Sequence, residues 1–187
     1  IGAITTHRTL ERSPVVHAHF PAVAEMAAHV ANVRVREVGT LGGNLCFAEP
    51  HADPGTLLLV HDASVALARQ GGTHTLALEQ FFVGPFEVVL ADDEILTAIQ
   101  VPALPAHTAA AYLKYGLLER PSVGVAVAVT ALPNQVQEVR IAVGCVGPTP
   151  RRLRDVEGLL SQKELPEVRA TLDTAGSLAP DGADVQF

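Results

Sequence analysis

The sequence has 187 residues, and 48% of them are hydrophobic, so the chain can bury the core of one domain or of two small ones. It carries 13 lysines and arginines against 20 aspartates and glutamates, a formal net charge of −7. This balance argues against general binding to nucleic acid or to an anionic membrane surface. An anionic ligand would therefore have to be held by local groups.

The two cysteines, Cys46 and Cys145, lie far apart and in no paired motif. This spacing favours neither a disulfide scaffold nor a metal cluster, and it predicts a reducing compartment, the cytoplasm. The longest apolar runs, such as residues 123–132, are too short for a membrane span. The chain begins with Ile1 in a strand-like stretch, which indicates a fragment of a longer polypeptide.

The first part of the sequence predicts a mixture of helices and strands. Thr6 is a candidate helix cap, and Pro21 suits the first turn of a helix, where its missing N–H costs nothing. The apolar periodicity predicts strands at 1–5 and 32–40, a short helix ended by Pro14, a helix over 15–30, and a helix that opens at Asp53 or Pro54. Further strands are predicted at 64–68, 71–78 and 94–102.

The composition changes near Ala106, after a stiff connection that contains Pro102 and Pro105. Beyond it, alternating apolar residues predict an antiparallel meander of three strands, followed by two helices and a terminal loop or frayed end; the ranges are 109–118, 122–132 and 136–147 for the strands, 149–160 and 165–176 for the helices, and 177–187 for the end. The predicted fold class is therefore α+β.

The segment TLGGNLCFAEPHADPG, residues 40–55, contains an adjacent glycine pair after a predicted strand. At Gly42 and Gly43, consecutive amide N–H groups could point into one concavity and bind phosphate oxygens without a lysine. Thr40 and Asn44 could add hydrogen bonds from a hydroxyl and an amide, and Asp53 could accept hydrogen bonds from sugar hydroxyls.

The alternative is structural: Gly42 and Gly43 form a bulge or a tight turn, and Asp53 is a helix N-cap. The glycine spacing matches neither the G-x-G-x-x-G of a Rossmann site nor a Walker A loop. The eight histidines have no metal-ligand spacing, and no Gly-x-Ser-x-Gly elbow supports a serine hydrolase. The basic cluster of Arg151, Arg152 and Arg154 favours a helix start or a partner contact over nucleic acid.

The segment VREVGTLGGNLCFAEPHADPG, residues 35–55, resembles the second glycine loop of the flavoprotein subunit of molybdenum hydroxylases, a family that includes carbon monoxide and xanthine dehydrogenases. That family has a Thr/Ser-hydrophobic-Gly-Gly-Asn loop, and an Asp-Pro or Asp-Leu turn nine residues after the asparagine. Asn44 and Asp53 have this spacing. The resemblance continues through 78–102, through AYLKY at 111–115 and through VRIAVGCVGPTPRR at 139–152.

The resemblance implies an FAD-binding domain of the PCMH/CO dehydrogenase flavoprotein type over residues 1–105, and a small C-terminal domain over 106–187. It also implies that a first glycine-rich diphosphate loop lies N-terminal to residue 1. For the cofactor, it implies that the FAD diphosphate is wrapped by Thr40, Leu41, Gly42, Gly43 and Asn44. It implies that Asp53 binds ribityl or ribose hydroxyls and that Val30 lies near the adenine. It also implies that Leu96 lies against the isoalloxazine and that Lys114 reaches the flavin.

Three of these residues have structural alternatives, since Leu96 and Val30 suit the core and Lys114 suits a solvated strand face. The resemblance implies a subunit that passes electrons from 2Fe-2S clusters on a small partner subunit, through FAD, to NAD or another acceptor. The molybdenum cofactor would lie on a large partner subunit, and no residue of this chain is expected to be catalytic. The alternatives are a stand-alone FAD oxidase or reductase, and a flavin-free scaffold subunit.

Overall fold

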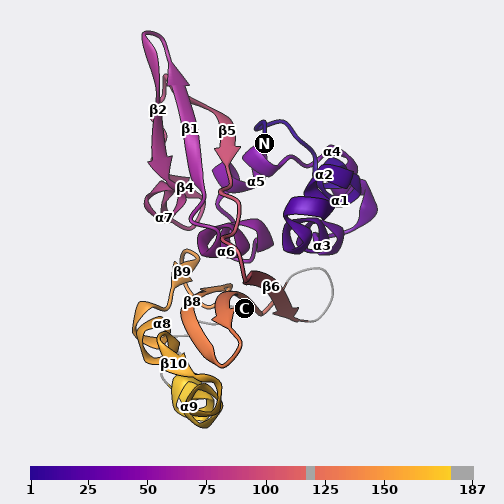
Figure 1. Ribbon diagram of the computed structural model, residues 1–187. Coiled ribbons are helices and arrows are strands. Elements are labelled where there is room, and N and C mark those ends of the chain that lie inside the picture. The colour runs from indigo at the N-terminus through magenta and orange to yellow at the C-terminus, as the bar shows by residue number, and fades with distance from the viewer. Residues whose placement is uncertain (117–120, 178–187) are drawn as a thin grey trace.

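The computed structural model of the protein describes residues 1–116 and 121–177. Figure 1 shows a first part that contains a cluster of helices beside a three-stranded sheet, and a second part in which a larger sheet carries two helices. In the described residues, no helix has both the length and the apolar character to cross a membrane.

Short helices form most of the chain up to residue 60. They are α1 (His7–Arg12), α2 (Pro14–His19), α3 (Pro21–His29), α4 (Val33–Val38), α5 (Leu41–Phe47) and α6 (Asp53–Val60). The hydroxyl of Thr6 accepts a hydrogen bond from the N–H of Thr9, which confirms the predicted cap of α1. The helix predicted over 15–30 is instead two helices, because Pro21 has no N–H with which to continue α2 and begins α3.

The two earliest predicted strands are wrong. Residues 33–38 form α4, which the Asn32 side chain caps by accepting hydrogen bonds from the N–H groups of Arg34 and Val35. The alternation of valines misled the prediction, because α4 has no buried residue. Residues 1–3 run beside β5 (Ile95–Gln100), but only Gly2 forms a β-bridge there, with Ala98.

The first sheet is antiparallel, with the strand order β2-β1-β5. Strands β1 (Ser64–Arg69), β2 (Gly72–Ala77) and β5 confirm the three strands predicted between residues 64 and 102. The connection from β2 to β5 contains α7 (Leu78–Phe81), β3 (Phe82–Gly84) and β4 (Glu87–Val88).

The second sheet confirms the predicted meander. Strands β6 (Thr108–Tyr115), β7 (Val123–Leu132) and β8 (Gln135–Gly144) pair antiparallel in sequence order. Residues 117–118 of the first predicted strand lie outside the described residues. The short strands β9 (Arg151–Arg152) and β10 (Lys163–Glu164) pair with β8. Helices α8 (Arg154–Leu160) and α9 (Leu165–Ser177) confirm the two predicted helices, and residues 178–187 of the predicted terminal loop lie outside the described residues.

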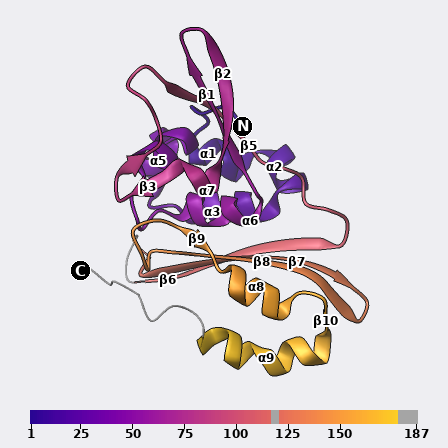
Figure 2. The same ribbon diagram turned by 90° about the vertical axis from the view of Figure 1, so that its left-hand side faces the viewer.

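The second sheet lies between α3 and α6 on one face and α8 and α9 on the other (Figure 2). Every residue of α6 is buried, and small residues of the sheet, such as Ala126 and Ala142, belong to the same core. A Cβ atom at Gly144 would overlap the Thr56 hydroxyl, so the sheet can approach α6 only with glycine there. This apolar core is continuous from α3 and β1 to the second sheet.

A network of ion pairs also joins the two parts. The Arg152 guanidinium bonds to Glu157 of α8, to the Asp62 carboxylate at 2.9 Å and to the carbonyl of Leu59. Arg140 of β8 donates to the other oxygen of Asp62 at 2.6 Å. Within the predicted basic cluster, Arg152 therefore has a structural use, because its side chain is 4% exposed and pairs with Glu157 and Asp62, and Arg154 begins α8.

Candidate functional site

A cavity of about 540 Å³ lies among the N-terminal helices, lined by residues between His7 and Asp53. Its wall comes from the first residue of α1, the end of α3, α4, α5 and the connection that leads into α6. Five of the predicted cofactor-binding residues line it: Val30, Thr40, Gly43, Asn44 and Asp53. Residues that are up to 23 positions apart in the sequence thus meet at one concave surface.

The other four predicted residues lie elsewhere. Leu41 is a fully buried core residue, and Gly42 packs against Ala3. Leu96 pairs with Leu67 in the first sheet and packs against the core. Lys114 does not line the cavity, but its side chain reaches Asp53, which does.

The glycine pair lies in the first turn of α5, not in an irregular turn after a strand. Its amides already have partners: Gly42 donates to the carbonyl of Ala3 at 2.9 Å, and Gly43 donates to the Thr40 hydroxyl, the α5 cap, at 3.0 Å. The amide of Asn44 donates to the carbonyl of Thr40. The expectation of a row of free amides is therefore wrong, and what approaches Gly42 so closely is the chain's own residue 3.

Asp53 occupies the boundary between the cavity and the second sheet. Its residue is 4% exposed, and Ala52 rather than Asp53 is the N-cap of α6. One carboxylate oxygen accepts a hydrogen bond from the Tyr112 hydroxyl at 2.6 Å, and the other lies 2.9 Å from the Lys114 ammonium. Lys114 also donates to the carbonyl of His29 at 2.6 Å, so α3, α6 and β6 meet at this ion pair.

Tyr112 was missed by the sequence analysis. Burial, and then the neighbouring Asp53 carboxylate, raise the pKa of Tyr112 well above its ordinary value, so the hydroxyl stays protonated and donates to Asp53. The signal was present in the segment AYLKY. Residues two apart in a strand lie on the same face, so Tyr112 points in the same direction as Lys114.

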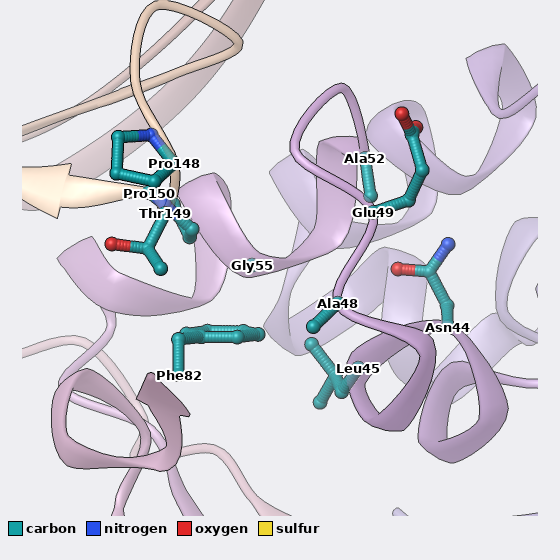
Figure 3. Close-up of a pocket in the computed structure, with 10 residues that line it drawn as sticks. All are labelled: Asn44, Leu45, Ala48, Glu49, Ala52, Gly55, Phe82, Pro148, Thr149 and Pro150. Atoms are coloured by element: carbon teal, nitrogen blue, oxygen red, sulfur yellow. The ribbon is translucent and has the colours of Figure 1, made fainter. Parts of the chain in front are cut away.

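A second, much smaller cavity lies between α5, α6 and the connection from β8 to β9 (Figure 3). Its volume of about 10 Å³ holds at most one water molecule. Phe82 and Pro150 lie at one end of it, and the polar side chains of Asn44 and Glu49 lie at the other. Asn44 therefore borders both cavities, and only the larger one has room for an organic ligand.

Within the described residues, no group of three histidine, cysteine, aspartate or glutamate side chains is arranged to hold a metal ion. Cys46 and Cys145 are both free. Burial, and then the Asp53 and Glu49 carboxylates, raise the pKa of Cys145 to about 12 from an ordinary 9.0. The thiol of Cys145 therefore stays protonated at neutral pH.

We expect thiol reagents to modify Cys145 slowly at pH 8, because only the thiolate reacts and its fraction is about one in ten thousand there. In a Cys46→Ser variant, the labelling rate should rise about tenfold per pH unit, without a plateau before about pH 11. The unfolded chain loses this proton near pH 9 and the folded chain near pH 12, so the contribution of Cys145 to stability falls as the pH rises between these values. A labelling plateau near pH 9 would contradict the assignment.

A family model described as the FAD binding domain in molybdopterin dehydrogenase matches residues 1–104, more than half of the chain. The chain belongs to this family. A model of the CO dehydrogenase flavoprotein C-terminal domain matches residues 120–185 of this molybdopterin dehydrogenase family member. Residues 1–104 are thus an FAD-binding domain, which confirms the resemblance seen in the sequence.

Curated relatives of this family member are subunits of dehydrogenases and hydroxylases. The carbon monoxide dehydrogenase medium chain of Hydrogenophaga pseudoflava is 32% identical over 190 residues, which cover 100% of this chain and 66% of the relative. The nicotine 6-hydroxylase medium subunit of Paenarthrobacter nicotinovorans is 33% identical over 174 residues, which cover 90% of this chain and 60% of the relative. The putative xanthine dehydrogenase FAD-binding subunit of Escherichia coli K12 is 32% identical, covering 84% and 55%. The chain therefore spans 55% to 66% of the length of these relatives.

Solved structures confirm the α+β fold of the molybdopterin dehydrogenase type. A carbon monoxide dehydrogenase from Hydrogenophaga pseudoflava that lacks the Mo-pyranopterin moiety of its cofactor superposes with a TM-score of 0.90 at 32% identity, covering 98% of this chain and 65% of that one. Quinoline 2-oxidoreductase from Pseudomonas putida 86 superposes with a TM-score of 0.87 at 27% identity, and the match covers 97% of this chain and 63% of that one. The fold of this chain is therefore that of the corresponding part of these oxidoreductases.

Proposed function

We propose that the polypeptide containing this chain is the FAD-binding subunit of a molybdenum hydroxylase. It would pass electrons from 2Fe-2S clusters on a small partner subunit to NAD or another acceptor, and the molybdenum cofactor would lie on a large partner subunit. One observation carries the assignment of the site: Val30, Thr40, Gly43, Asn44 and Asp53 line a single cavity of about 540 Å³ in an FAD-binding domain. When bound, FAD supplies the redox chemistry.

The chain's own residues then have distinct tasks. Thr40 would donate its hydroxyl hydrogen to the diphosphate, Gly43 would line the cavity beside it with its own amide held by Thr40, and Val30 would contact the adenine. The Asp53 carboxylate uses one lone pair of each oxygen for Tyr112 or Lys114, so a second lone pair remains to accept a hydrogen bond from a sugar hydroxyl. Asn44 lines the same cavity, so its side-chain amide could donate a hydrogen bond to the cofactor.

The remaining predicted residues would act at one remove or on the flavin ring. Leu41 and Gly42 would hold α5 in place, because Leu41 is buried in the core and Gly42 donates to the carbonyl of Ala3. Leu96 would lie against the isoalloxazine. Lys114 would bring positive charge from the second sheet to the flavin side of Asp53, where a cation favours the anionic reduced form of the cofactor.

We further propose that the chain divides into functional units at residues 105 and 106, within the connection between β5 and β6, as the ranges of the two family models support. The two free cysteines, Cys46 and Cys145, support a reducing compartment such as the cytoplasm.

FAD binding by the whole polypeptide tests the function, and a matched pair of variants tests the site. We expect the purified protein to show the visible absorption of bound flavin. Thr40→Ala should raise the Kd for FAD about tenfold, because it removes a hydroxyl at the cavity. Ser13→Ala removes the equivalent cap of α2, outside the cavity, and should leave the Kd unchanged although both variants lose about 1 kcal/mol of stability.

The outcomes separate the alternatives. Equal FAD affinity in the wild type and Thr40→Ala would overturn the assignment of Thr40. A wild-type protein that binds no FAD, alone or with partner subunits, would overturn the proposed function in favour of a scaffold. A flavin-loaded chain that oxidises a small substrate without partner subunits would instead support a stand-alone oxidase.

A further inference from the structure

His7 stands at the cavity, although neither the sequence motifs nor the glycine segment pointed to it. It is the first residue of α1, and its N–H donates to the carbonyl of Gly39 at 3.0 Å. Its ring lies against the same segment, since the Cδ2 atom is 3.3 Å from the position of a Cβ atom at Gly39. Thr40, the next residue, forms a β-bridge with Thr6. The His7 ring is thereby fixed beside the turn that opens α5.

The imidazole of His7 is buried and incompletely bonded. The residue is 2% exposed, and its Nδ1 atom has no hydrogen-bond partner. Among the described side chains that line the cavity, only His7 and Asn44 have a buried polar atom in this condition. Unpartnered buried polar atoms are rare in folded proteins, because the lost hydration costs free energy that only a hydrogen bond offsets.

The nearest charged groups do not supply the missing bond. Asp53 is engaged by Tyr112 and Lys114, and the Arg36 guanidinium bonds to Glu11 and to the carbonyls of Val30 and Ala31. Burial lowers the pKa of His7, with Arg36 adding to the effect and Asp53 opposing it. The ring is therefore neutral near pH 7, with one nitrogen that donates and one that accepts.

A hydroxyl group suits such a ring, because a hydroxyl can donate or accept and so can pair with either tautomer. No lysine or arginine is among the described residues that line the cavity, whereas Asp53, a group suited to hydroxyls, is within electrostatic reach of His7. We propose that His7 is a cofactor-binding residue whose imidazole, which lines the cavity, forms a hydrogen bond with a hydroxyl of the dinucleotide, on its ribityl chain or its ribose. This inference rests on the proposed function.

The test compares His7→Leu with His7→Asn in the whole polypeptide, by titration with FAD and by melting of the FAD-free protein. Leucine removes the ring nitrogens, so the Kd for FAD should rise about tenfold, while the melting temperature of the FAD-free protein stays the same or rises because an unpartnered polar group is gone. Asparagine places a polar atom near the Nδ1 position, so it should restore the Kd to within about threefold of the wild type.

Competition by two fragments of FAD identifies the hydroxyl, and a second buried histidine serves as the control. Competition by FMN, which carries the ribityl chain, and by ADP, which carries the ribose, identifies the hydroxyl, since only one fragment should lose affinity in His7→Leu. His61→Leu is the matched control, because His61 is equally buried and does not line the cavity; its Kd should not change.

Three results would overturn the inference. The first is an unchanged Kd in His7→Leu while the wild type binds FAD. The second is a combination of two effects: the FAD-free His7→Leu protein melts at a lower temperature, and His7→Asn does not restore FAD binding. That result would show that His7 has a structural role. The third is the absence of FAD binding by the wild type. This measurement is made before any variant is tested, and it would overturn the proposed function as well.

Discussion

Asp53→Asn is expected to lower the free energy of unfolding by about 3 kcal/mol, because it removes one partner of a largely buried ion pair. Asp53 is almost fully buried, and the Lys114 side chain is 22% exposed, so the loss falls at the lower end of the range for buried pairs. The asparagine amide also brings two N–H donors to a place where Tyr112 and Lys114 already donate.

Chemical denaturation of Asp53→Asn, Lys114→Met and the double variant measures this coupling. The double variant should be more stable than the sum of the two single effects predicts, by 1 kcal/mol or more, since no uncompensated charge remains. Glu79→Gln is the matched control: its ion pair with Arg154 is exposed, so the same change of acid to amide should alter stability by less than about 0.5 kcal/mol. Additive single effects at Asp53 and Lys114 would show that the pair is not coupled.

Gly42→Ala is expected to lower the free energy of unfolding by about 2 kcal/mol. A Cβ atom there would lie 2.7 Å from the Cβ and carbonyl oxygen of Ala3 and 2.9 Å from its Cα. Overpacking of this kind costs up to about 3 kcal/mol, while alanine gains about 1 kcal/mol over glycine in a helix. The steric term is the larger, because two of the three nearest atoms are backbone and cannot rotate away.

Gly158→Ala provides the control by making the same substitution in a different helix. Gly158 lies in α8, and a Cβ atom there would meet nothing within 4 Å, so only the gain of helix propensity remains. Denaturation midpoints should therefore move in opposite directions in the two variants. If Gly42→Ala were as stable as the wild type, the close contact with Ala3 would not exist in solution.

The sequence predicts the local features of this fold well. Caps and prolines act within a few residues, so Thr6 and Pro21 mark helix starts correctly. The meander of β6, β7 and β8 follows from strict alternation. Alternation fails at residues 33–38, because the valines of α4 are not buried and therefore carry no information about the periodicity of a core.

The candidate site is only partly predictable, for a different reason. The sequence motif brings Thr40, Gly43, Asn44 and Asp53 to attention, and the structure places them on one cavity. The amide of Gly42 bonds to Ala3, about 40 positions away, and the carboxylate of Asp53 bonds to Tyr112, about 60 positions away. No local pattern contains that information. His7 escaped notice because its buried, unpartnered nitrogen is a property of the folded chain alone.

The attachment of residues 1–5 to both α5 and β5 has a consequence for folding kinetics. The carbonyls of Ala3 and Thr5 accept hydrogen bonds from the amides of Gly42 and Leu41. Ile1 and Ile99 exchange hydrogen bonds, and the amide of Ala3 donates to the carbonyl of Thr97. These contacts close loops of about 40 and about 100 residues, so the entropic cost of closure comes before any of them is made. We therefore expect the wall of the cavity to form late in folding, when these distant segments have come together.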